Sequence, residues 1–491
     1  MLGSTTLLLA TAMWVVIILA ISLYARYGGA RKRSFEDYVL ADRGFSARLV
    51  WCSVLGTYIG GGTLAALAGK MYDVGIVYIF VPLGVAISYG LLALFSSRYR
   101  SSGEKQIDYL ERNQSVSLVD RLAREYGKSV RYPAGFLVVG IMASFMAIQI
   151  RAGGTAISAY LKIDPFIASA LFFSLIAVYV YLAGARADAL TDMFQVIVIL
   201  IGICAGLTGL IVSGKAMDLF NTARALSPDV FSFPKGSLGL VIGFMILPFF
   251  SLHADAGIHQ KILSARDDTA AKRGLWGASV TYLFFGIMLL MLAMLARGAT
   301  LQLNHPDEVL MSFSLAVFPS GLQILIILAF LSAIASTLDS QAILFSSIVV
   351  NDLIPALPHR NRDTRTESRQ KQNFVAARIW AFAGLTTGLS LTLIPLKLFD
   401  FLTVIWVTAM TAFGIPVVGL LWQWLRKGLT EAFVKWGIVL SAFTMIFLAL
   451  VFYRSGVAEL TAVMIQCTFA AILLYLGIAV IAALVAQRRA H

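Results

Sequence analysis

The chain has 491 residues, of which 59% are hydrophobic and 13% are charged. This composition excludes a soluble globular protein and indicates a polytopic membrane protein. The net charge of +13 does not indicate a nucleic-acid partner, because the basic residues lie in short loops between apolar runs, where they control membrane orientation. Cys52, Cys204 and Cys467 lie in apolar stretches at unrelated spacings and predict neither disulfides nor a thiolate metal site.

Runs of roughly 20 or more apolar residues predict about thirteen membrane-spanning helices. The positive-inside rule places the N-terminus outside and the C-terminus inside. The first run is expected to be a retained span and not a signal peptide, because no positive charge precedes it. The loops are too short for a further domain, so residues 1–491 are expected to form a single membrane domain. In chain order the spans are expected near 5–25, 47–70, 75–97, 132–160, 165–184, 187–213, 237–263, 274–296, 321–350, 375–394, 398–424, 433–453 and 458–486.

The second expected span contains three consecutive glycines, Gly60, Gly61 and Gly62. Each glycine destabilises a helix by about 1 kcal/mol relative to alanine, so this span is expected to unwind there. Unwound backbone at membrane depth is tolerated where its carbonyls face protein or a polar cavity, and transporters bind ions and substrates at such breaks. The alternative is close packing of small residues between helices.

Charged residues also lie inside other expected spans, among them three aspartates and one arginine. The rise of about 1.5 Å per residue allows Asp192, Asp255 and Asp339 to line one inward pathway. Arg151 lies near the outer end of the fourth span, where snorkelling to the interface explains it. Roles for Arg151 in anion recognition or in an outer gate stay open.

The ninth expected span carries a polar stripe. Ser336, Asp339 and Ser340 stand at i, i+3 and i+4 and share one helix face, with Ala333 one turn earlier and Thr337 beside them. A carboxylate at mid-depth costs about 2.5 to 3.5 kcal/mol on insertion scales, so this face is expected to line a cavity or bind an ion. Hydrogen bonding between helices is the alternative.

The break in the second span and the stripe in the ninth lie at similar depths, so the two are expected to meet. Together they offer five oxygens, which are uncharged and therefore suit a hard monovalent cation better than zinc or copper. We predict sodium as the coupling ion and no other cofactor. The oxygens are the carbonyls of Gly56, Ile59 and Ala333 and the hydroxyls of Ser336 and Thr337.

Five motifs follow one another along the chain: Ser34-Phe-Glu-Asp-Tyr-Val-Leu-Ala-Asp-Arg43, Ala183-Gly-Ala-Arg-Ala-Asp-Ala-Leu-Thr-Asp-Met-Phe-Gln195, Gln260-Lys-Ile-Leu-Ser-Ala-Arg266, Ala333-Ile-Ala-Ser-Thr-Leu-Asp-Ser-Gln341 and Gly414-Ile-Pro416. With these motifs in this order, the chain resembles the sodium/solute symporter family, also called solute carrier family 5. The resemblance implies an all-α leucine-transporter-type fold of five plus five helices in inverted repeats. A leading helix (5–25) and two trailing helices (433–486) would flank the repeats at 47–213 and 237–424.

The resemblance implies a main sodium site on the same five oxygens. Some members have a second sodium site, whose aspartate matches Asp192 and whose hydroxyls match Ser336 and Ser340. Asp339 stands where such members carry a serine. A second sodium, a bound proton and an aspartate pair that shares one proton therefore all stay open.

The expected function is symport in the bacterial inner membrane, where inward sodium movement drives uptake of a small polar solute such as an amino acid or a carboxylate. Its partners would be sodium, the solute and the lipid bilayer. Proton-coupled symport and a transporter-like sensor that acts through a separate protein are the alternatives, and an enzyme is not expected, because the sequence offers no clustered metal site or activated nucleophile. Candidate pocket residues, each of which ordinary packing also explains, are Tyr58, Thr63, Gln149, Phe249, Phe250, His253 and Trp406.

Overall fold

The computed structural model describes residues 4–27, 34–100, 115–161, 163–182, 184–233, 238–303, 306–356, 367–393, 398–421 and 429–455, with a few isolated residues beyond 476. Among these residues the only β pairing is a bridge between Phe45 and Ala265, so the expected all-α class is confirmed. The long helices are α1 (Ser4–Tyr27), α5 (Phe80–Arg100), α7 (Arg131–Leu161), α8 (Pro165–Leu182), α9 (Ala185–Val212), α13 (Asp268–Ala296), α15 (Ser320–Ile348), α16 (Glu367–Leu391), α17 (Leu398–Leu421) and α19 (Glu431–Ser455).

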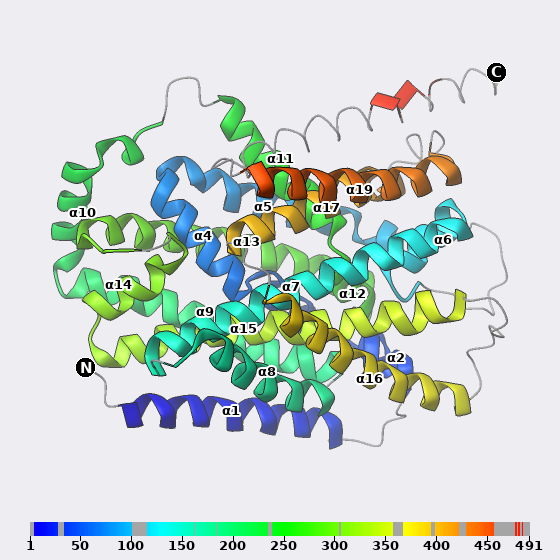
Figure 1. Cartoon of the computed structure of the whole chain (residues 1–491), viewed down its shortest axis with the longest axis horizontal. Coiled ribbons are helices and arrows are strands. Elements are labelled where there is room, and N and C mark those ends of the chain that lie inside the picture. Colours follow the sequence, from blue (N-terminus) through cyan, green and yellow to red (C-terminus); the bar gives the residue numbers. More distant parts are fainter. Residues whose placement is uncertain are drawn as a thin grey trace.

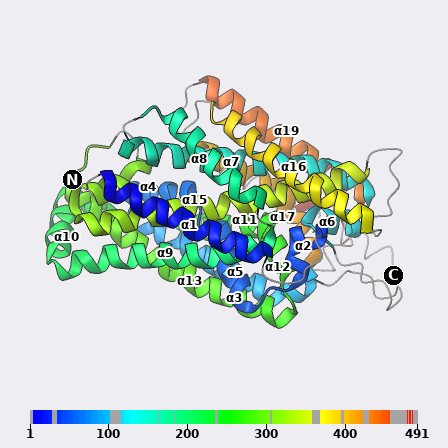
Figure 2. The same cartoon turned by 90° about the horizontal axis from the view of Figure 1, so that it is seen from below.

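Most long helices run along the long axis of the molecule, as Figures 1 and 2 show. The short helices α10 (Lys215–Leu226) and α14 (Val309–Val317) lie at one end of this bundle, and α2 (Phe35–Leu40) and α6 (Leu118–Tyr126) lie at the opposite end. Within the bundle α15 contacts α7, α9 and α16, and it is buried from Ala329 to its end. The polar stripe of α15 therefore faces protein on all sides.

Seven described helices are long and apolar enough to cross a membrane, or eight if one bent pair counts as a single span. They coincide with predicted spans. The total of about thirteen and the orientation of the termini stay predictions, and most of the expected span at 458–486 lies outside the described residues.

The predicted break in the second span is confirmed. α3 (Ala47–Tyr58) ends before Ile59, and α4 (Gly61–Val74) begins after Gly60, whose backbone is extended. The break is narrower than expected, because Gly61 and Gly62 are already helical. A β-carbon on Gly61 would overlap with the side chain of Ile334. This glycine therefore permits close packing of α4 on α15, which was the alternative explanation for the three consecutive glycines.

A second break, which the sequence did not predict, divides the expected span at 237–263. α11 (Leu238–Ala254) and α12 (Ala256–Ser264) meet at an angle of 58°. Asp255 forms the joint, because its Oδ1 accepts hydrogen bonds from the amides of Gly257 at 2.7 Å and Ile258 at 3.0 Å. These bonds satisfy amides that every helix N-terminus leaves free.

Two arginines hold the other end of α12. Arg100 Nη1 donates to the carbonyls of Ile262 at 2.8 Å and Ala265 at 2.6 Å. Arg43 Nη1 donates to the carbonyl of Leu263 at 3.2 Å. Guanidinium groups at a helix C-terminus compensate both the free carbonyls and the helix dipole, so both ends of α12 are fixed by charged side chains.

Candidate functional site

Oxygen atoms converge where the break between α3 and α4 meets α15. The hydroxyls of Ser336 and Thr337 donate to the carbonyl of Gly56 at 3.0 and 3.1 Å, and also lie 3.2 and 3.1 Å from the carbonyl of Ala333. Each of the two hydroxyls is thus within hydrogen-bonding distance of both carbonyls, which brings together four of the five predicted oxygens. The fifth belongs to Ile59, which is buried and ends α3 with non-helical backbone angles.

A group of three carboxylates lies beside these oxygens. Asp188 and Asp192 come from α9 and Asp339 from α15, and one oxygen of each lies within 4.8 Å of the others. All three are fully buried. Asp192 Oδ2 accepts a hydrogen bond of 2.7 Å from Ser53, whereas no described group donates to Oδ1. We call Asp188, Asp192 and Asp339 the carboxylate cluster.

Gly56 joins the cluster to the oxygens at the break. A β-carbon on this residue would lie 2.6 Å from Asp192 Oδ1. Only glycine allows the carboxylate to approach the backbone of α3 this closely. The residue whose carbonyl meets Ser336 and Thr337 therefore also touches the carboxylate cluster.

The sequence predicted that Asp192 lies with Asp339 and Ser340, but two charged partners of this group were not predicted. Lys261 on α12 is 3% exposed and forms an ion pair with Asp188. Its Nζ also lies 3.0 Å from Ser340 Oγ. The sequence held a signal for both residues, because Asp188 precedes Asp192 by one helical turn and Lys261 is a charged residue inside the expected span at 237–263. Opposite charges within spans are expected to pair.

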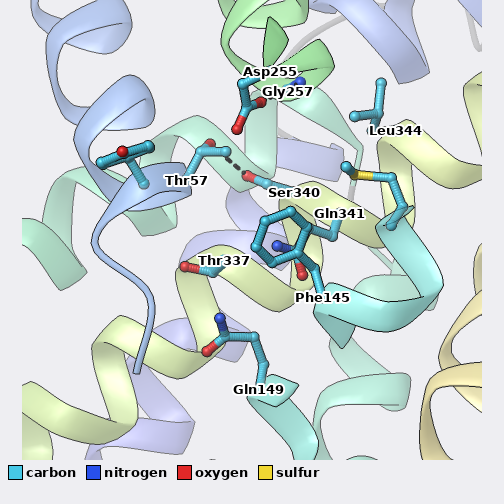
Figure 3. Close-up of a pocket in the computed structure, with 11 residues that line it drawn as sticks. Thr57, Phe145, Gln149, Asp255, Gly257, Thr337, Ser340, Gln341 and Leu344 are labelled. Carbon is cyan, nitrogen blue, oxygen red and sulfur yellow. Dashed lines mark hydrogen bonds between the residues drawn. The ribbon is translucent and has the colours of Figure 1, made fainter. Parts of the chain in front are cut away.

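A pocket lies beside the break, between the end of α3 and the polar stripe of α15 (Figure 3). Asp255 stands at one end of the view and Gln149 at the other, with Ser340 and Thr337 between them. The pocket thus reaches the oxygens contributed by α15. Its lining residues are Thr57, Tyr58, Met142, Phe145, Gln149, Asp255, Gly257, Thr337, Ser340, Gln341 and Leu344.

Two of the predicted pocket residues, Tyr58 and Gln149, line this pocket. Phe249, Phe250 and His253 do not line it. The two phenylalanine rings pack on each other with centroids 5.0 Å apart, and His253 Nδ1 bonds to the carbonyl of Phe249 at 2.7 Å. Besides these contacts within α11, Phe250 lies against Gly414 of α17 and the ring of His253 faces Tyr99 of α5. The side chains of Thr63 and Trp406 lie outside the described part of the chain.

The pocket offers one carboxylate, two amides, several hydroxyls and aromatic surface. The Gln149 Oε1 accepts from the amide of Gly62 at 3.1 Å, which leaves its buried Nε2 without a described partner. Asp255 uses only Oδ1 to cap α12. No lysine or arginine is among the described residues that line the pocket.

Two broken helices packed against a buried polar helix, with a pocket between them, define a secondary transporter of the leucine-transporter type. The chain belongs to the sodium:solute symporter family, whose sequence model matches residues 38–427. This confirms the resemblance and assigns sodium-coupled symport as the class of activity. The family and its relatives are transporters and not enzymes.

Curated relatives are similar at low identity. A sodium/pantothenate symporter of Escherichia coli is 24% identical over 458 residues, which cover 88% of this chain and 89% of the relative. The high-affinity proline transporter PutP of Bacillus subtilis is 23% identical over 343 residues, or 67% and 71% of the two chains. The names of these relatives differ in substrate, so they assign no substrate to this chain.

Solved structures confirm the fold. A sodium-coupled sialic acid symporter in a substrate-bound outward-open state superposes with a TM-score of 0.75 at 17% identity, over 98% of this chain and 96% of that one. The nucleobase-cation-symport-1 transporter Mhp1 superposes with a TM-score of 0.57 at 12% identity, over 94% and 95%. The expected leucine-transporter-type architecture is therefore correct.

Proposed function

We propose that this protein couples the inward movement of sodium to the uptake of a small polar organic solute across a bacterial inner membrane. One observation carries the proposal: the hydroxyls of Ser336 and Thr337 converge with the carbonyl of Gly56 at the break between α3 and α4. Such uncharged oxygens suit a hard monovalent cation. With the carbonyls of Ile59 and Ala333 they would form the main sodium site.

Sodium at this site would bridge α3 and α15, which meet here through neutral hydrogen bonds. The ion would take the place of these hydrogen bonds, with the hydroxyl protons turned away from it, and would draw the broken end of α3 toward α15. A ligand can shift a conformational equilibrium only by its differential affinity for the two states. Because the oxygens come from different elements, sodium binds best in the state that keeps α3 and α15 together, and it stabilises the adjoining pocket in that state.

The test is solute accumulation in sealed vesicles with and without an imposed sodium gradient. A thermal-shift screen in sodium buffer first selects solutes that stabilise the purified protein. We expect accumulation that depends on the sodium gradient and persists when a proton gradient is abolished. Accumulation driven by the proton gradient alone would establish proton coupling instead. Stabilisation without accumulation under any gradient would favour the sensor.

The pocket favours a solute that carries a positively charged nitrogen. Asp255 places a carboxylate at the pocket, and the described lining residues include no cationic side chain to receive an anion. An ammonium group next to Asp255 would gain a charge-assisted hydrogen bond. Of the solutes expected from the sequence, an amino acid fits this environment better than a simple carboxylate.

Asp255→Asn is expected to weaken amine binding by about tenfold or more, since losing one partner of a buried charge pair costs about 2 to 5 kcal/mol. Asparagine caps helices as well as aspartate, so α12 should persist. Thermal shifts with amino acids and with monocarboxylates measure the effect. Asp267→Asn makes the same exchange at the exposed N-cap of α13, where Asp267 Oδ1 accepts from Ala270 at 2.6 Å, and should change nothing. Preferential binding of monocarboxylates to both variants would contradict the assignment.

A further inference from the structure

Ser340 Oγ, predicted from the sequence as part of a second cation site, is already engaged by two charged groups. It donates to Asp188 at 2.7 Å and accepts from Lys261 at 3.0 Å. The Thr57 hydroxyl also lies 3.1 Å away, but its single proton has a nearer acceptor in the carbonyl of Ser53 at 2.8 Å. Sodium at this oxygen would therefore compete with the Lys261 ammonium.

The group already at this oxygen is itself a monovalent cation. The Lys261 ammonium lies between Asp188 and Ser340 and is almost completely buried. A buried ammonium is tolerated only when it is paired and hydrogen-bonded, and the carboxylate cluster supplies that pairing. A second sodium at Ser340 would meet this like charge at close range in a poorly hydrated site.

We propose that the Lys261 ammonium is a tethered cation that fills the second cation position, so that the protein binds one sodium ion and not two. This inference rests on the proposed main sodium site. The ammonium neutralises Asp188, the member of the carboxylate cluster to which Ser340 donates. The unpartnered Asp192 Oδ1 lies instead against Gly56, whose carbonyl belongs to the main site. The remaining negative charge of Asp192 would therefore act on the transported sodium.

Lysine 261 is on α12, whereas the main sodium oxygens are on α3 and α15. The tethered cation therefore links α12 to α9 and α15 through Asp188 and Ser340. A free second sodium would leave with each transport cycle, but a covalently held ammonium cannot. Its charge would stay in the protein, and the solute would be driven by one sodium per cycle.

The experiment measures binding of radioactive sodium to the purified full-length protein in detergent, at constant ionic strength with potassium as the replacement ion. The wild type is expected to bind one sodium with a Hill coefficient of about one. Lys261→Met removes the ammonium and should raise the bound sodium about twofold and the Hill coefficient toward about two. Lys261→Arg keeps a cation and should stay at one sodium. Lys272→Met, the same exchange at an exposed residue of α13, is the matched control.

Two sodium ions bound to the wild type, or one bound to a folded Lys261→Met variant, would overturn the proposal. If Lys261→Met cannot be recovered folded, the stoichiometry of the wild type alone decides, because two sodium ions leave no position for the ammonium. Thr337→Ala separates this idea from the proposed function. In the wild-type background it should weaken sodium binding by roughly tenfold or more, whereas Lys261→Met with Thr337→Ala should still bind one sodium tightly at the vacated position. Wild-type sodium affinity in Thr337→Ala, together with a second sodium gained in Lys261→Met, would refute only the main site.

Discussion

Alanine at Thr337 or Ser336 is expected to weaken sodium binding by roughly tenfold or more, because each exchange removes one ion-coordinating oxygen. Both hydroxyls contact the carbonyl of Gly56, so each exchange also loosens α15 from the break. The helix itself tolerates alanine. Sodium-dependent thermal stabilisation of the purified variants, compared with potassium at equal ionic strength, measures the loss.

Ser332→Ala is the matched control for these variants. Ser332 lies on the same helix, but its hydroxyl accepts a hydrogen bond from Trp14 of α1 at 2.8 Å and does not reach the break. Its sodium affinity should equal that of the wild type. Wild-type sodium affinity in both Ser336→Ala and Thr337→Ala would show that the ion binds elsewhere.

Gly61→Leu is expected to abolish transport while the protein still inserts into the membrane. A β-carbon at this position overlaps with Cγ1 of Ile334, and even alanine must force α4 away from α15. Overpacking a buried contact typically costs about 1 to 3 kcal/mol. The displaced α4 adjoins the break, where Gly56 and Ile59 would contribute to the proposed main sodium site, so the strain acts on the ion as well as on stability. Sodium-driven uptake in vesicles, normalised to membrane-inserted protein, is the measurement.

A second-site exchange tests this explanation directly. Ile334→Ala removes the two atoms that a β-carbon on Gly61 meets first and leaves Ile334 Cβ at 3.2 Å. Gly61→Ala combined with Ile334→Ala should therefore recover sodium affinity relative to Gly61→Ala alone. Gly140→Ala on α7 is the control, since a β-carbon there meets nothing within 4 Å. Wild-type transport by Gly61→Leu would mean that α4 and α15 separate easily at this contact.

The break between α3 and α4 could be predicted because its cause is local. Consecutive glycines weaken a helix wherever they occur, and the carbonyl of Gly56 meets the α15 hydroxyls because the two segments share a depth. The break at Asp255 has no comparable signal. One aspartate in an apolar run reads equally well as a helix cap or as a residue of an ion pathway, and only the bend of 58° distinguishes the two.

Ion pairs between spans that are distant in the chain could not be predicted from the sequence, for a different reason. Lys261 and Asp188 are 73 residues apart, and depth along the membrane does not fix which helix faces a given neighbour. The same limit explains Phe249, Phe250 and His253. A helix that is apolar on every side carries no periodic pattern to orient it, so the sequence could not decide whether residues of α11 face the pocket.

α12 has a consequence for how events at its two ends are related. It is a rod of nine residues, about 13 Å long at 1.5 Å per residue. Asp255 stands at the pocket end, Lys261 lies along its length, and Arg100 and Arg43 hold its far end. A single helical segment this short moves as one piece, so a tilt imposed at the pocket reappears undiminished at the guanidinium contacts. Occupation of the pocket would thereby change the contacts of Arg100 and Arg43 through rigid-body motion of α12, without a relay of intervening side chains.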